Sequence, residues 1–391
     1  MPLHNQATET SDGRLSSRPE RSYRRIVVKA GTSLLTGGTD RLDPEVMATL
    51  VEQIAGLQSS DRQMMLVTSG AVAAGRHVLG VPRDGGDLPM RQVLAAVGQG
   101  RLMHAYEQLF EPHGIPVAQA LLSRRDLSDR LGYLNVRNTL LGLMDKRVVP
   151  IINENDVVAV DEVSGQVFGD NDTLAAMVAN VVDADLLLIL GEVEGLFTAD
   201  PNLDSDARLI PSVDRLSADM DSVAGPTLDQ NARGGMATKL EAARLATASG
   251  VDTVIANGRT PDAVTRLADG EGLGTFFPAT STRLESRQRW MVSQVSESDA
   301  IVVDEGAARA LVSQNRSLLP PGVLDVLGSF ERGDIVSIVQ PDRNRIACGI
   351  ANYSSGDISR IRRLRSSEIT DTLDHHYGDE VVHRNNMVVL S

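Results

Sequence analysis

The sequence predicts a three-layer α/β sandwich with a mainly parallel central sheet, followed by a small, mostly β domain. Short apolar runs of strand length alternate with longer helical patterns from residue 25 onward. The runs are continuous rather than alternating, which is typical of parallel strands that are covered on both faces. After residue 297, short strand-like runs separated by glycine and proline replace this alternation.

Five runs in the first part are expected to form strands, at 26–29, 64–68, 148–153, 185–190 and 253–256. Helical patterns lie between them, at 44–57, 69–79, 90–110, 133–146, 172–181 and 238–249. Alternating strands and helices favour a parallel sheet with helices on both faces. Ligands of such sheets bind at the carboxyl ends of the strands.

Composition shifts predict the domain organisation. Residues 1–24 are polar and contain no apolar segment, so we expect a disordered tail rather than a secretory signal. The α/β domain is expected at 25–284, a linker at 285–297 and the small domain at 298–391. Strands of the small domain are expected at 300–303, 322–327, 334–338, 345–350 and 388–390.

The overall composition is that of a globular protein, with 42% hydrophobic and 23% charged residues. The net charge of −14 disfavours binding to nucleic acid or to anionic membranes. A single cysteine, Cys348, excludes an intrachain disulfide, and no apolar run is long enough to span a bilayer. These features predict a cytoplasmic protein.

Several common catalytic motifs are absent from the sequence. It contains no P-loop signature, no Gly-x-Gly-x-x-Gly after the first strand and no Gly-x-Ser-x-Gly elbow. Its seven histidines show no His-x-x-x-His spacing, so a histidine-based zinc site has little support.

Two strand ends carry residues suited to anions. Lys29 ends the first strand and is followed by Gly31, which lets a phosphate approach the backbone. Ser69 follows the second strand and precedes a helix whose free N–H groups can hold an anion. Taken alone, Lys29 is better explained as a solvated lysine at a strand end, whereas a simple N-cap explains Ser69 about as well as anion binding does.

Two polar clusters and a glycine loop complete the set. Residues 153–156 (NEND) follow the third run, and residues 169–173 (GDNDT) open a helix. Both clusters suit a polar ligand that carries an amine, although turns and caps use the same residue types. Residues 234–239 (GGMATK) read either as a phosphate loop with a cation or as an ordinary loop.

In combination these segments closely resemble the glutamate 5-kinase family of the amino-acid kinase superfamily. The motifs run in order as VVKAGTS, VTSGAVAAG, AAVGQ, INENDVV, FGDNDTLAA, EGLFTADP and GGMATK, between residues 27 and 239. The segments VDEGAARAL (303–311) and SLLPPGV (317–323) resemble the PUA domain of the same family. The resemblance covers residues 25–391 and implies the amino-acid kinase fold.

The resemblance also implies roles for single residues. Lys29 and Lys239 match two phosphate-stabilising lysines, and Asp172 matches the aspartate that orients them. Ser69, Asp156 and Asn171 match positions that bind glutamate. ATP is expected to contact Lys29, Gly31, Gly191, Glu192, Arg233, Gly234, Gly235, Met236, Ala237, Thr238 and Lys239. No metal ligand is expected from the protein, and Mg²⁺ is expected to arrive with ATP.

Two positions depart from the family pattern, and both lie on the nucleotide side. Gly191-Glu192 stands where the family usually has Ser or Thr followed by Asp, and Arg233 replaces a usual Thr. The segments that are expected to bind the substrate match the family pattern.

The implied activity is ATP-dependent phosphorylation of the γ-carboxylate of L-glutamate, the first step of proline biosynthesis. A homo-oligomer, feedback inhibition by proline and a functional link to glutamyl phosphate reductase are implied in the same way. One alternative is a kinase of another carboxylate, carbamate or phosphate in the same superfamily. The other is a non-catalytic RNA-binding or regulatory protein, which a net charge of −4 over residues 295–391 disfavours.

Overall fold

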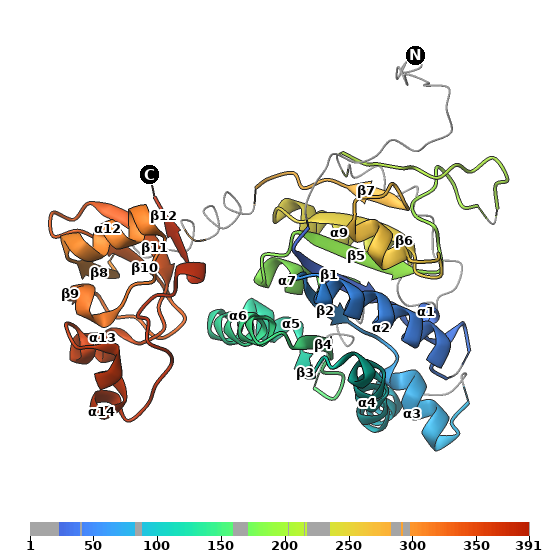
Figure 1. Ribbon diagram of the computed structural model, residues 1–391, viewed down its shortest axis with the longest axis horizontal. Coiled ribbons are helices and arrows are strands. Elements are labelled where there is room, and N and C mark those ends of the chain that lie inside the picture. The colour runs from blue at the N-terminus through green and yellow to red at the C-terminus, as the bar shows by residue number, and fades with distance from the viewer. Residues whose placement is uncertain are drawn as a thin grey trace, which may run out of the picture.

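The computed structural model describes residues 23–39, 41–82, 88–158, 171–201, 203–214, 216, 235–282, 291 and 298–390. These residues form two separate sheets, each with its own helices (Figure 1). The larger sheet has seven strands in the order β3-β4-β2-β1-β5-β6-β7, and the smaller has five in the order β12-β11-β10-β8-β9.

The seven-stranded sheet is parallel except at one edge. Its strands are β1 (Arg25–Ala30), β2 (Gln63–Val67), β3 (Val117–Leu122), β4 (Val149–Glu154), β5 (Leu186–Gly191), β6 (Asp252–Asn257) and β7 (Thr275–Phe277). The central strand β1 pairs in parallel with β2 and β5, whereas β7 pairs antiparallel with β6. This mainly parallel sheet confirms the predicted fold class.

Helices cover both faces of this sheet, which makes three layers. One apolar core includes residues of α1 (Thr32–Thr36), α2 (Pro44–Ser59), α3 (Ala71–Leu79), α4 (Leu88–Phe110) and α10 (Ala263–Ala268). The opposite core includes residues of α5 (Arg124–Ser128), α6 (Arg130–Asp145), α7 (Asn171–Val181) and α9 (Met236–Ala248). Along β1, Ile26 and Val28 enter the first core and Val27 the second, as the strand period of two requires.

The five strands and six helices predicted for this part are present, with shifted ends. Helix α3 begins at Ala71 rather than at the predicted Ser69, because Gly70 takes the N-cap position with φ 103°. The sequence patterns missed β3, which lies at the edge of the sheet, and β7, which has three residues.

The smaller sheet consists of β8 (Ala300–Val303), β9 (Val323–Leu327), β10 (Ile335–Val339), β11 (Arg345–Ile350) and β12 (Met387–Val389). Its helices are α12 (Glu305–Gln314), α13 (Ser355–Ile361) and α14 (Ile369–Leu373), which the sequence patterns did not predict. Short 3₁₀ turns lie at Glu111–His113, Pro320–Gly322, Ser366–Glu368 and Arg384–Asn386. The main core of this unit joins all three helices to one face of the sheet.

Helix α6 lies between the two units (Figure 1). Its Leu134 shares an apolar cluster with Ile335 and Cys348 of the smaller sheet. Arg137, 2% exposed, donates to Asn386 Oδ1 at 2.7 Å and pairs with Asp183 at 2.6 Å. One buried side chain of α6 therefore holds the smaller unit against the residues that follow α7.

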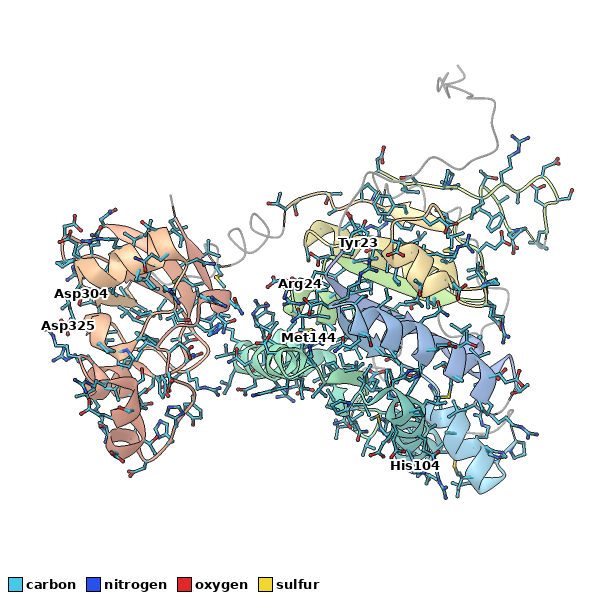
Figure 2. All side chains as sticks on the ribbon, in the orientation of Figure 1. Tyr23, Arg24, His104, Met144, Asp304 and Asp325 are labelled. Carbon is cyan, nitrogen blue, oxygen red and sulfur yellow. The ribbon has the colours of Figure 1, made fainter. Side chains whose placement is uncertain are left out.

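The beginning of the described chain is packed against the larger unit (Figure 2). Tyr23 is buried, and its hydroxyl donates to Asp252 at 2.9 Å. The rest of the predicted tail, and the predicted linker apart from Met291, lie outside the described residues. None of the described helices combines the length and the apolar character needed to cross a bilayer.

Candidate active site

The core of the candidate site is a buried carboxylate held between two lysines. Lys29 Nζ lies 2.5 Å from Asp172 Oδ1, and Lys239 Nζ lies 3.0 Å from Asp172 Oδ2. The aspartate is fully buried, and the lysine side chains are 4% and 9% exposed. The three charges sum to +1, so the cluster suits an anionic ligand.

The strand period explains why these side chains meet. Val27 of β1 faces the core beneath α7 and α9, so Lys29, two residues later, points to the same face. Asp172 is the second residue of α7, and Lys239 is the fourth residue of α9. The positive end of the α7 dipole favours the ionised form of a carboxylate placed there. The fold therefore gathers the three predicted catalytic residues.

Glycines leave space around the two ammonium groups. A Cβ at Gly31 would lie 3.4 Å from Lys29 Nζ, and one at Gly191 would lie 3.4 Å from Lys239 Cε. Gly235 occupies the N-cap of α9 and has no side chain that could cap the helix. The N-terminus of a helix without such a cap suits phosphate oxygens, and here it lies one turn from Lys239.

The remaining nucleotide-side residues are less fully defined. Met236, Ala237 and Thr238 form the first turn of α9, and Thr238 Oγ1 lies 3.1 Å from Asp172 Oδ2. Glu192 has Arg259 at 4.0 Å, with both side chains more than a third exposed. Arg233 and Gly234 lie outside the described residues. The structure thus brings only part of the predicted ATP set to the lysine pair.

A network of side-chain amides adjoins the charged cluster. Asn171 Nδ2 donates to Ser69 Oγ at 2.8 Å, to Thr68 O at 2.7 Å and to Asn153 Oδ1 at 3.0 Å. Ser69 is buried but does not cap α3, so the simple capping explanation of this serine is wrong. Two of the three predicted substrate residues therefore touch each other next to Asp172.

The third predicted substrate residue, Asp156, lies in the turn after β4 and is half-buried. This turn follows Asn153, which belongs to the amide network. The carboxyl end of β4 therefore supplies one amide, Asn153, to the network, and Asp156 follows it three residues later.

Sequence reasoning gave no individual role to four residues of this region. Asn153 Nδ2 donates to Gln99 Oε1 at 2.8 Å, and Thr68 Oγ1 lies 2.7 Å from the hydroxyl of Tyr106. Burial raises the pKa of the Tyr106 phenol above its ordinary value. Gln99 and Asn153 lie in the motifs AAVGQ and INENDVV, and these motifs were the feature of the sequence that could have identified them as site residues.

Comparison with known proteins identifies two families in this chain. The profile of the amino acid kinase family matches residues 24–257, and that of the PUA domain matches residues 299–373. A glutamate 5-kinase of Dehalococcoides mccartyi (strain CBDB1) is 51% identical over 371 residues, covering 95% of this chain and 100% of that protein. Glutamate 5-kinases of Herpetosiphon aurantiacus and Deinococcus radiodurans are 50% and 45% identical, each covering 94% of this chain and 99% and 100% of their own length.

Proposed function

The chain belongs to the amino acid kinase family, and from that premise we propose that it transfers the γ-phosphoryl group of ATP to the γ-carboxylate of L-glutamate. The product is γ-glutamyl phosphate, and the reaction is the first step of proline biosynthesis. The single observation that carries the proposal is the placement of Asp172 between Lys29 and Lys239.

The chemistry fits this arrangement because a carboxylate is already a nucleophile. Its pKa of about 4 leaves it ionised at neutral pH, so no general base is needed. The difficulty is to bring one anion against another and to stabilise the negative charge that spreads over the transferring group. Two ammonium groups fixed by one buried carboxylate supply that stabilisation without rearranging during the reaction.

Both lysines bind the phosphates of ATP in this proposal. Lys29 and Lys239 contact oxygens of the β- and γ-phosphates, while Asp172 holds both ammonium groups in position. The N–H groups at the start of α9, after Gly235, bind phosphate oxygens as well. ATP enters with Mg²⁺, which neutralises part of the phosphate charge. Gly31 and Gly191 place no side chain against the two lysines, where the phosphates of ATP are proposed to bind.

The amide network takes the amino-acid substrate. Ser69, Asp156 and Asn171 bind the α-amino and α-carboxylate groups of glutamate, which directs its γ-carboxylate toward the lysine pair. Asn171 and Asp172 are neighbours in α7, so the substrate network and the charged cluster are joined through one helix turn.

The described contacts of the smaller unit argue against a primary RNA-binding role. The run at residues 359–365 holds four arginines, but two of them are engaged within the protein. Arg360 donates to the carbonyl of Thr372, and Arg362 pairs with Asp325 at 2.5 Å. We propose that the protein acts in the reducing cytoplasm, consistent with a single buried thiol, Cys348. A homo-oligomer and a link to a reductase remain predictions from the family.

A substrate panel tests the proposed reaction. Purified protein is incubated with Mg²⁺, ATP and hydroxylamine, which converts an acyl phosphate to a hydroxamate. L-glutamate, L-aspartate, N-acetyl-L-glutamate and carbamate are compared at equal concentration. We expect hydroxamate from L-glutamate and little from the other carboxylates. Turnover of one of the other substrates in its place would assign the chain to a different reaction of the same superfamily.

A further inference from the structure

The amide network next to Asp172 ends in two unsatisfied polar atoms. Asn171 Oδ1 and Gln99 Nε2 are buried and have no hydrogen-bond partner in the described part of the chain. One atom is an acceptor and the other a donor. Buried polar groups are normally paired, so an acceptor and a donor left open at the ends of one network point to a ligand that completes both.

The bonds within the network fix which atoms stay open. Asn171 uses its amide nitrogen for Ser69, Thr68 and Asn153, so its oxygen remains. Asn153 accepts from Asn171 and donates to Gln99 Oε1 at 2.8 Å. The oxygen of Gln99 is thereby used, and only its N–H₂ group is left to face a ligand.

Close helix packing holds Gln99 at this place. A Cβ at Gly98 would lie 1.8 Å from Ala71 O and 2.4 Å from Gly75 N, so only glycine permits this approach of α4 to α3. Because α3 begins just after Ser69, the same contact that seats Gln99 also sets the position of the serine. The motif AAVGQ thus supplies a glycine for packing and a glutamine for the site.

We propose that Gln99 is a specificity residue that donates a hydrogen bond to the α-carboxylate of the amino-acid substrate, while Asn171 Oδ1 accepts from its ammonium group. This inference rests on the proposed function and adds a residue to it. An amide N–H₂ group can only donate, so it selects a carboxylate and rejects an ammonium group.

The α-carboxylate is the partner because the γ-carboxylate is needed elsewhere. To receive a phosphoryl group, the γ-carboxylate must lie beside Lys29 and Lys239. In the described part of the chain, hydrogen bonds through Asn153 and Asn171 separate Gln99 from the charged cluster, so we assign Gln99 to the opposite end of the substrate.

The variant Gln99→Glu separates a donor role from a structural one. Its carboxylate can still accept from Asn153, so the network is retained, but the open donor becomes an acceptor that repels a carboxylate. We expect kcat/KM for L-glutamate to fall about 10- to 100-fold, mainly through KM, as for loss of a hydrogen bond to a charged group. The KM for ATP should stay within about twofold, because uniform binding of the nucleotide is not altered.

A substrate analogue shows which group Gln99 contacts. The α-amide of L-glutamate keeps the reacting γ-carboxylate but replaces the α-carboxylate by a group that can donate. The wild-type protein should have a much higher kcat/KM for glutamate than for this amide. In Gln99→Glu the ratio of these two kcat/KM values should fall about tenfold or more, since the new carboxylate can accept a hydrogen bond from the amide. Gln108→Glu, an exposed position on the same helix, is the matched control and should leave both substrates unchanged.

The outcomes separate the two claims. Equal losses for glutamate and its α-amide in Gln99→Glu, or no loss at all, would overturn the assignment of Gln99 while the wild-type activity stood. If the wild-type protein turned over no glutamate, the proposed function and the role of Gln99 would both be wrong. A narrowed preference in Gln99→Glu, with Gln108→Glu like wild type, is the result that supports the inference.

Discussion

Replacing Lys239 by methionine tests whether its ammonium group stabilises the transition state. Methionine keeps most of the apolar stem and removes the ammonium group that lies 3.0 Å from Asp172 Oδ2. Removing one preorganised group that stabilises transition-state charge lowers kcat about 10²- to 10³-fold, equivalent to about 3–4 kcal/mol. The Lys239 side chain is only 9% exposed, so solvent and salt screen this contribution weakly.

The same variant should leave folding and glutamate binding nearly intact. Asp172 keeps Lys29 at 2.5 Å, so the buried carboxylate is not left without a cation. The glutamate network of Asn171 and Ser69 uses no atom of Lys239. We therefore expect the KM for glutamate to change by less than about threefold and the free energy of unfolding by less than about 2 kcal/mol.

The assay is hydroxamate formation at saturating ATP and glutamate, combined with thermal unfolding of each protein. The sequence contains three lysines, Lys29, Lys146 and Lys239, so Lys146→Met is a matched control at an exposed position. A kcat within threefold of wild type in Lys239→Met would refute the catalytic role. A large drop in unfolding temperature would instead show that the lysine serves mainly to stabilise the fold.

Three further predictions concern stability and access. Asp172→Asn leaves two buried ammonium groups facing a neutral amide, and we expect a loss of about 3–5 kcal/mol in denaturant unfolding together with loss of activity; an unfolding midpoint like wild type would contradict this. Gly98→Ala places a methyl group against backbone and should destabilise by about 1–3 kcal/mol or more and weaken glutamate binding, whereas Gly100→Ala, with nothing within 4 Å, should be neutral or stabilising by up to about 1 kcal/mol. Burial raises the pKa of the Cys348 thiol from 9.0 to about 11, so at pH 8 its thiolate fraction is about 100-fold lower than that of an exposed thiol and alkylation should be slow. Arg137→Leu, which removes the hydrogen bonds of this side chain to Asn386 and the ion pair with Asp183, should accelerate that alkylation, and an unchanged rate would show that Arg137 does not hold the units together.

Parallel strands were the most predictable part of the fold. The runs that became β1 and β5 are apolar at most positions because both faces of these strands are covered, so composition alone marks them. Strand β3 was missed because it lies at the sheet edge and includes the exposed Gln119. Strand β7 was missed because three residues are too few to show a hydrophobic pattern. The helices of the smaller unit have ten, seven and five residues, and the sequence analysis recognised no helical hydrophobic pattern in them.

The charged cluster was predictable, while only Ser69 and Asn171 of the amide network were predicted. Lys29 and Lys239 were found through motifs at a strand end and a glycine loop, and two of the three lysines of the chain lie in the site, which is a further signal. Gln99 and Asn153 gain their meaning only from the direction of each hydrogen bond, which no sequence pattern gives. Arg137 was unpredictable for a related reason, since its partners lie at Asp183 and Asn386, far along the chain.

The most direct test of the central claim follows an oxygen atom from substrate to phosphate. L-glutamate labelled with ¹⁸O in its γ-carboxylate is incubated with Mg²⁺, ATP and the protein, without hydroxylamine. If a γ-carboxylate oxygen attacks the γ-phosphorus of ATP, that oxygen bridges carbon and phosphorus in the acyl phosphate. Attack of the α-amine on the γ-carbonyl carbon then releases phosphate that retains the bridging oxygen. The account predicts inorganic phosphate with one ¹⁸O atom by mass spectrometry, and phosphate without ¹⁸O would show that water, not the carboxylate, accepts the phosphoryl group.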